Sequence, residues 1–207
     1  MRSEYIEKEV WQALLPAMPY YTALAMLVSL ETGLRSGDIV RIRTEDLTED
    51  GFHYVAQKTK KAGFARCSAE LLEALKTGAE GGWCFPSGRL GSKNPYRTRQ
   101  SLWYGVRKAA DRAALKAHVS PHSARKTFAV GYYRKKGIKA LQEVLQHGDT
   151  NTTNLYAFSD MQGATYNRER LISEVSEKVL LRLSEVLEAN LSPLPPYPEI
   201  TGENDLK

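Results

Sequence analysis

The stretch Ser120-Pro-His-Ser-Ala-Arg-Lys-Thr-Phe-Ala-Val-Gly-Tyr-Tyr-Arg-Lys-Lys-Gly137 predicts a helix that starts at a Ser-Pro pair and ends at a glycine. Pro121 is harmless in the first turn, where its missing N–H would have no partner. His122 and Arg125 are three residues apart, so both side chains project from one face near the helix start. Unpaired N–H groups and the positive end of the helix dipole favour an anion there. The pair therefore suits a phosphate group.

Helical periodicity covers most of the remaining chain, which predicts a fold that is mainly α with a small antiparallel β-sheet. The apolar spacing indicates helices over 5–15, 20–31, 68–76, 94–117, 139–146, 150–157 and 168–189. Gly33 is a stop signal, and Ser36 suits the cap of a short helix through Ile42. Short strands at 52–57 and 64–67 flank a basic connection at 58–63, which predicts a hairpin, and 83–85 is a candidate third strand.

The composition describes one globular unit. The chain has 207 residues, 42% of them hydrophobic and 26% charged, which is enough apolar mass for a core of its own. Cys67 and Cys84 form no C-x-x-C pair, which argues against a disulfide framework or a cysteine zinc site. The apolar stretch from Leu14 to Leu30 is too short and too interrupted to span a bilayer, and no secretory signal precedes it. We therefore expect a cytoplasmic protein.

Positive charge is concentrated in the body of the chain. The net charge is +5, and because residues 185–207 carry −4, residues 1–184 carry +9. Lysines and arginines gather at 35–43, 58–66, 93–108 and 125–139. A single cluster of this kind is well explained as a solvated helix face, but several together favour a polyanion such as nucleic acid as partner.

Two further segments place reactive side chains near helix starts. Thr32-Gly-Leu-Arg-Ser-Gly-Asp-Ile39 contains Arg35, and Leu145-Gln-His-Gly-Asp-Thr-Asn-Thr-Thr-Asn-Leu-Tyr156 contains His147 and Tyr156, nine residues apart. Thr150 can cap a new helix after the intervening glycine. His147 and Tyr156 therefore converge only if the chain bends between them.

These motifs together resemble the catalytic domain of tyrosine recombinases, the phage integrase family. The family pattern is an Arg in a T-G-x-R turn, a Lys on a β-hairpin, an H-x-x-R motif, and a His or Trp nine residues before a nucleophilic Tyr. The matching residues here, in family order, are Arg35, Lys58, His122, Arg125, His147 and Tyr156. The likeness spans about residues 5–187. Gln146, Gly148 and Ser123-Ala124 depart from the usual family residues beside these positions.

The resemblance implies a site-specific recombinase that cleaves and rejoins double-stranded DNA with no metal, cofactor or ATP. The Tyr156 phenol would attack the phosphate while Arg35 and Arg125 grip its non-bridging oxygens. His122 would act as the general base, and His147 would hydrogen-bond the scissile phosphate. Lys58 would protonate the leaving 5′ oxygen, although Lys60 and Lys61 are close enough to take that role. A 3′-phosphotyrosyl link would store the bond energy for rejoining.

Other interpretations stay open at this point. The same fold could serve a catalytically silent DNA-binding regulator or a DNA-relaxing enzyme like the type IB topoisomerases. A zinc site at His118 and His122 lacks a third ligand nearby. Trp103 and the pair Tyr132-Tyr133 are interpreted as core residues rather than as base-stacking platforms.

The resemblance also implies a domain layout. Residues 1–190 would form the catalytic domain, and residues 191–207 a flexible, Pro-rich acidic tail. The helix at 168–189 would dock on a neighbouring copy within a tetramer on DNA, or pack on its own domain. Because only residues 1–4 precede the first helix, the N-terminal DNA-clamping domain of the family is expected to be absent, and DNA affinity to be modest and salt-dependent.

Overall fold

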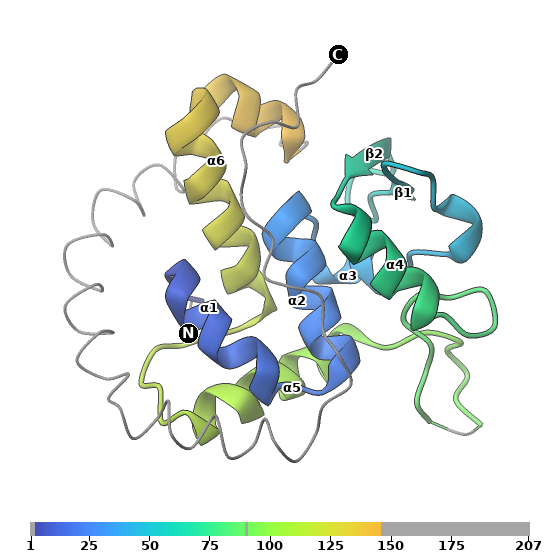
Figure 1. Cartoon of the computed structure of the whole chain (residues 1–207), viewed down its shortest axis with the longest axis horizontal. Coiled ribbons are helices and arrows are strands. Elements are labelled where there is room, and N and C mark those ends of the chain that lie inside the picture. The colour runs from blue at the N-terminus through green and yellow to red at the C-terminus, as the bar shows by residue number, and fades with distance from the viewer. Residues whose placement is uncertain (1–2, 90, 146–207) are drawn as a thin grey trace.

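The structure of the chain, a computed structural model, describes residues 3–89 and 91–145. Within that part of the chain, helices pack around one central helix, and a two-stranded hairpin lies to one side (Figure 1). The predictions for His147, for Tyr156, for the helices at 150–157 and 168–189, and for the tail at 191–207 all fall outside the described residues.

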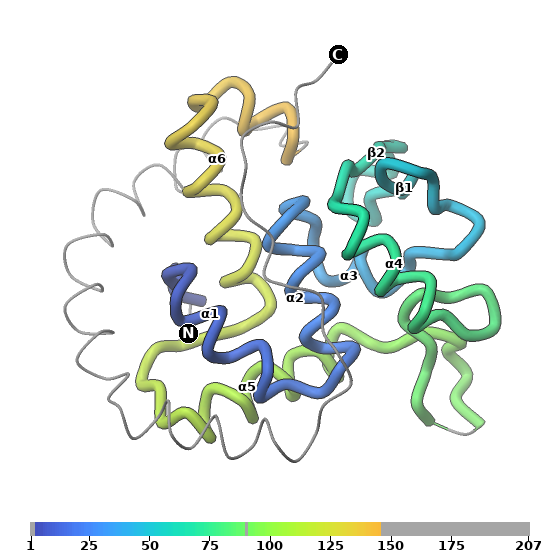
Figure 2. The backbone as a smooth tube through the Cα atoms, viewed as in Figure 1, coloured from blue at the N-terminus to red at the C-terminus, as the bar shows by residue number. Residues whose placement is uncertain are grey.

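Helix α2 (Tyr20–Thr32) forms the centre of the fold. It is buried around its whole circumference from Thr22 to Leu30, as its nearly uniform apolar sequence predicts. It contacts α4 (Ala69–Thr77), α5 (Arg99–Arg112) and α6 (Pro121–Val144). Figure 2 shows α2 between α6 on one side and α4 on the other. The helix ends at Gly33 with a φ of 70°, which confirms the predicted stop.

The first helix is shorter than predicted. Helix α1 (Lys8–Leu14) begins three residues after the predicted start at Tyr5, and a 3-10 turn, η1 (Leu15–Ala17), follows it. The preceding segment is extended because it bonds to the loop before α6: the Glu4 N–H donates to the His118 carbonyl at 3.1 Å. The Trp11 indole then donates to the Thr127 hydroxyl at 2.9 Å, which ties α1 to α6.

The short helix after Gly33 also differs from its prediction. Helix α3 (Ser36–Ile39) has four residues, and Ser36 is its first helical residue rather than its cap. Arg35 takes the cap position in an extended conformation. The helix does not continue to Ile42, because the next residues tighten into turns in which Ile42 N–H bonds the Ile39 carbonyl at 3.1 Å. A 3-10 turn, η2 (Thr44–Asp46), leads into the hairpin.

The predicted hairpin is present, and the candidate third strand is not. Strand β1 (Gly51–Val55) pairs antiparallel with β2 (Ala62–Arg66), from Gly51 opposite Arg66 to Val55 opposite Ala62. The prediction of a strand at 83–85 was wrong: Trp83 makes only isolated bridges. The reason is local, because its N–H and carbonyl bond back to Glu80 at 3.0 and 3.1 Å in a tight turn.

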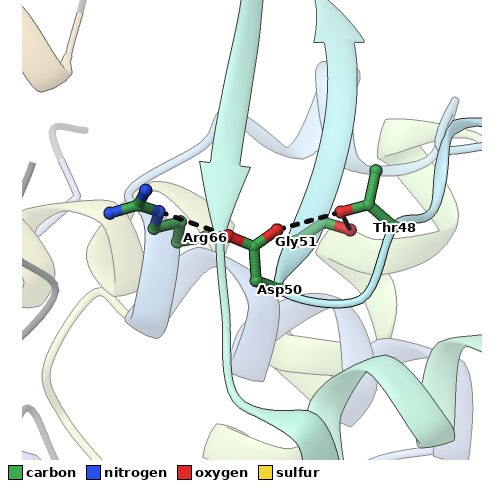
Figure 3. A network of polar contacts seen from close by, with 4 residues as sticks. All are labelled: Thr48, Asp50, Gly51 and Arg66. Carbon is green, nitrogen blue, oxygen red and sulfur yellow. Dashed lines mark hydrogen bonds and ion pairs between the residues drawn. The ribbon is translucent and has the colours of Figure 1, made fainter. Parts of the chain in front are cut away.

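A polar network closes the base of the hairpin (Figure 3). The Thr48 hydroxyl donates to the Asp50 carboxylate at 3.2 Å and lies 3.0 Å from the Gly51 carbonyl, and Asp50 pairs with Arg66 at 3.5 Å. A Cβ at Gly51 would lie 2.2 Å from the Ala65 carbonyl oxygen, so the strands approach too closely there for any other residue. The hairpin register is therefore fixed at its base.

The remaining helices begin at capping residues. The Ser68 hydroxyl caps α4 by accepting from the Leu71 N–H at 3.4 Å. Helix α5 begins at Arg99, five residues after the predicted start, because the Thr98 hydroxyl accepts from the Ser101 N–H and caps it there. Helix α6 kinks at Gly137, where φ is 80° and ψ is −179°, so the predicted helices before and after that glycine are two arms of one element.

The fold class is confirmed, with one correction to the core. The helices enclose a continuous apolar cluster, to which the helical stretch predicted at 94–117 contributes Leu102, Val106, Ala109, Ala113 and Leu115. The interpretation of Trp103 as core was wrong: it is 40% exposed, because it lies on the outer face of α5 beside Tyr104. No helix among the described residues is long and apolar enough to cross a membrane.

Candidate active site

Four of the six predicted site residues line one pocket of about 430 Å³. They are Arg35, Lys58, His122 and Arg125, called the four motif residues below. They come from three parts of the chain: the turn after α2, the hairpin tip, and the start of α6. Gly37, Asp38, Gln57 and Arg99 are further lining residues.

Arg125 is the deepest cation of the pocket. It is 3% exposed, and its guanidinium donates to the Gly33 carbonyl and, at 3.3 Å, to the Leu145 carbonyl. These two bonds join the end of α2 to the far arm of α6. The side chain is placed by the helix start, where the Ser120 N–H donates to the Ser123 hydroxyl at 3.2 Å. Ser123, a departure from the usual family residue, thus helps to fix the helix that carries Arg125.

Arg35 stands opposite, at the entrance to α3. Its backbone is extended, and its carbonyl accepts from the N–H groups of Asp38 and Ile39 at 2.8 and 3.0 Å. The half-buried side chain makes no hydrogen bond or ion pair with the part of the chain that the structure describes. Its guanidinium is therefore available for an anion in the pocket.

A buried carboxylate places the hairpin tip. Asp38 is 4% exposed and accepts from the Gln57 N–H at 2.9 Å, so α3 holds the chain directly before Lys58. The sequence analysis missed both Asp38 and Gln57. The sequence signal for Asp38 is its position, three places after Arg35 and inside the short helix that follows the turn.

The structure separates the three lysines of the tip. Lys58 lines the pocket, whereas Lys60 and Lys61 do not. Lys60 sits in the left-handed region with a φ of 57°, and its N–H bonds the Ala56 carbonyl at 2.7 Å to close the turn. The Lys61 carbonyl, directly before β2, accepts from the Ala56 N–H at 2.9 Å. This arrangement favours Lys58 over the two alternatives.

His122 is held in its neutral form. Desolvation lowers its pKa, and repulsion from Lys126, Arg125 and Arg35 lowers it further, to about 4 from the ordinary 6.5. Because His122 as a whole residue is exposed at the pocket, we attribute its lowered pKa chiefly to the neighbouring positive charges. A neutral imidazole can accept a proton at pH 7.

The phenol of Tyr54 lies near the same charges. Tyr54 on β1 is half-buried, and burial raises its pKa. Repulsion from Asp38 adds to the rise, while Arg125 and Arg35 oppose it. Tyr54 is therefore a protonated phenol at neutral pH and a useful control for any experiment on Tyr156.

The cysteines and histidines form no metal site in the part of the chain that the structure describes, where no group of three or more candidate ligands gathers. Cys67 and Cys84 are buried free thiols, and burial with nearby carboxylates raises the pKa of each to about 12. Neither thiol is a nucleophile at neutral pH.

The pocket as a whole suits an oxyanion. It holds three guanidinium groups and one ammonium, and its single carboxylate already accepts a hydrogen bond. Arginine keeps its charge at any physiological pH and can grip two phosphate oxygens at once. The arrangement can therefore bind a phosphodiester and stabilise the negative charge that develops when it is attacked.

A model described as "Phage integrase family" matches residues 4–163. The chain belongs to this family. Among curated members, it is 27% identical to tyrosine recombinase XerC of Xylella fastidiosa (strain M23) over 140 residues, which cover 63% of this chain and 46% of the relative. It is 28% identical to tyrosine recombinase XerD of Rhizobium meliloti (strain 1021) over 136 residues, covering 60% and 43%. The chain thus spans less than half the length of these phage integrase relatives.

Solved structures of the phage integrase family share the fold. A lambda integrase(75-356) dimer bound to a COC′ core site has a TM-score of 0.64 at 17% identity, covering 75% of this chain and 59% of that one. XerA recombinase has a TM-score of 0.62 at 20% identity, covering 81% and 66%. The predicted catalytic-domain fold is confirmed.

Proposed function

We propose that this chain is the catalytic part of a site-specific DNA recombinase that cleaves and rejoins DNA through a 3′-phosphotyrosyl intermediate. The observation that carries the proposal is the meeting of the four motif residues in one pocket. These residues lie up to 90 positions apart in the sequence, and only the family pattern predicts that they meet. Family membership over residues 4–163 supports the same conclusion.

Each motif residue has a role that its setting supports. Arg125, fixed by two carbonyls, and Arg35, which has an available guanidinium, would bind the non-bridging oxygens and stabilise the transition state. His122, neutral at pH 7, would take the proton of the attacking phenol. Lys58 would protonate the leaving 5′ oxygen. Tyr156 would supply the nucleophile and His147 a further hydrogen bond to the phosphate; both roles rest on the sequence motif.

The partners follow from the reaction. The curated relatives are named tyrosine recombinases, and solved family members include a lambda integrase tetramer bound to a Holliday junction. We infer that this chain also acts on double-stranded DNA as a tetramer, with the helix at 168–189 joining its copies. We infer from this substrate that the protein acts where the cell's DNA lies, in the cytoplasm.

The test is the trapping of the covalent intermediate. Candidate duplexes carry a nick beside the scissile phosphate, so that the short leaving strand diffuses away and the protein–DNA adduct accumulates. After incubation in EDTA, denaturing gels should show labelled DNA that migrates with the protein. The adduct should vanish with Tyr156→Phe and persist with Tyr54→Phe, which removes a phenol that lies near Arg35 and Arg125.

Two outcomes would overturn the proposal. DNA binding without an adduct on any duplex would leave a silent DNA-binding regulator. The other outcome is that the protein relaxes supercoiled plasmid and forms an adduct that never rejoins to a second duplex; this result would indicate a DNA-relaxing enzyme.

A further inference from the structure

Helix α5 contributes to the pocket a residue that no family motif singles out. Arg99 is the first residue of α5, and its side chain lines the pocket with the four motif residues. The cap before it fixes its backbone, since the Thr98 hydroxyl accepts from the Ser101 N–H at 3.1 Å. Arg99 therefore projects from a formed helix end rather than from a loop.

Gly37 in α3 makes room for the Arg99 side chain. A Cβ at position 37 would lie 3.0 Å from the Arg99 Cδ and 3.6 Å from its Cγ. The aliphatic part of Arg99 thus crosses directly over α3, two residues after Arg35. This contact holds the guanidinium at the edge of the pocket although the residue is exposed.

The Arg99 guanidinium has no hydrogen bond or ion pair with any residue in 3–89 or 91–145. Two other arginines of the surface bind acids: Arg43 pairs with Glu45 at 2.6 Å, and Arg107 with Asp111 at 2.7 Å. A positive side chain that is placed by a helix cap and a glycine contact, but lacks an acidic partner, is suited to an external anion.

We propose that Arg99 binds the backbone phosphate next to the one attacked and so positions the DNA strand in the pocket. The inference rests on the proposed function and deepens it. Arg125 is buried and Arg35 half-buried, whereas Arg99 is exposed at the edge, which places it beside the reacting phosphate rather than on it. A contact to a neighbouring phosphate is equally strong before and during the reaction, so it acts on DNA binding and not on the rate of the bound complex.

The first measurement is DNA binding against salt, by fluorescence anisotropy with a labelled 30-bp duplex of mixed sequence. Arg99→Gln should weaken binding roughly ten-fold and reduce the slope of log K against log salt by about 0.9, the value for one phosphate contact. Arg99→Lys keeps the charge and should keep the slope. The matched control is Arg112→Gln, which removes the same charge from an exposed position at the other end of α5 and should leave the slope unchanged.

The second measurement is the single-turnover rate of adduct formation at saturating DNA, on a nicked duplex that the unaltered protein cleaves. At saturating DNA, the rate of adduct formation by Arg99→Gln should stay within about three-fold of that of the unaltered protein. The rate of Arg125→Gln should fall by more than this. An unchanged salt slope in Arg99→Gln, or an equal change in Arg112→Gln, overturns the inference, and so does a large loss of the saturated rate. If the unaltered protein forms no adduct, the proposed function fails, and the salt slopes still decide the role of Arg99.

Discussion

At the scale of single residues, Lys58 offers a specific chemical test. If it protonates the leaving oxygen, Lys58→Ala should slow adduct formation by about 10²–10⁴-fold, the usual contribution of a general acid. A duplex with sulfur in place of the bridging 5′ oxygen should restore the rate, because a thiolate leaves without a proton. The measurement is single-turnover cleavage of both duplexes.

The neighbouring lysines provide the controls for Lys58. Lys60→Ala and Lys61→Ala should cleave both duplexes as the unaltered protein does, since neither side chain lines the pocket. A Lys60→Ala or Lys61→Ala variant that is slow with oxygen and restored by sulfur would transfer the role to that lysine.

The low pKa of His122 predicts a pH dependence of stability with a definite sign. Its pKa of about 4 in the folded protein lies below the ordinary 6.5 of the unfolded chain. Its contribution to stability is therefore complete above pH 6.5 and lost as the pH falls toward 4. Urea unfolding at pH 7 and pH 5 should show a loss that is smaller in His122→Asn.

NMR of the imidazole gives an independent check on His122. The C2 proton should titrate well below pH 6 in the free protein. Its pKa should rise when a DNA duplex is added, because phosphates offset the charges of Arg35, Arg125 and Lys126. A titration near pH 6.5 without DNA would contradict the assignment of the site charges.

At the scale of elements, α5 packs on α2 through a glycine. A Cβ at Gly105 would lie 2.4 Å from the Thr22 hydroxyl and 2.8 Å from its methyl group. Gly105→Ala gains about 1 kcal/mol in helix propensity but overpacks the contact, which costs about 1–3 kcal/mol. We therefore expect a lower urea midpoint, and recovery in the double variant Thr22→Ala/Gly105→Ala.

An exposed position on the same helix controls for the Gly105 prediction. Lys108→Ala should change the free energy of unfolding by less than about 0.5 kcal/mol. A Gly105→Ala variant as stable as the unaltered protein would mean that α5 can shift away from α2 without loss.

The elements also show what the sequence can and cannot predict. The centre of α2, the stop at Gly33 and the cap at Ser68 were predictable because each depends on residues next to one another. The start of α1 and the absent strand at 83–85 were not, since distant or turn-forming bonds of Glu4 and Glu80 decide them. The same distinction applies to the site. The resemblance to the family pattern named the four motif residues, whereas the buried Asp38 and the pocket-lining Arg99 could be identified only from the contacts of α3 with the hairpin and with α5.

At the scale of the whole molecule, the pocket depends on the packing of α2 against α6. Arg125 bonds the carbonyl at the end of α2 and that of Leu145 beyond the kink, so relative movement of the two helices would separate Arg125 from Arg35. A second apolar cluster, of Phe128, Ala129, Leu141 and Leu145, packs together the parts of α6 before and after the kink. A Cβ at Gly33 would lie 2.4 Å from the Phe128 ring, so the helices are in close contact there.

The two thiols can report whether the molecule opens as one unit. Cys67 and Cys84 belong to the same apolar cluster, at 8% and 0% exposure, and the pKa of each is raised to about 12. A thiol reagent at pH 8 should therefore leave the native protein unlabelled for as long as it stays folded, and label both cysteines in urea. Measured separately in Cys67→Ala and Cys84→Ala variants, the two labelling rates should agree with each other and with the rate of global unfolding. Fast labelling of Cys67 alone would show instead that the hairpin and the start of α4 open independently, and the position of Lys58 would then vary without any change in the core around α2.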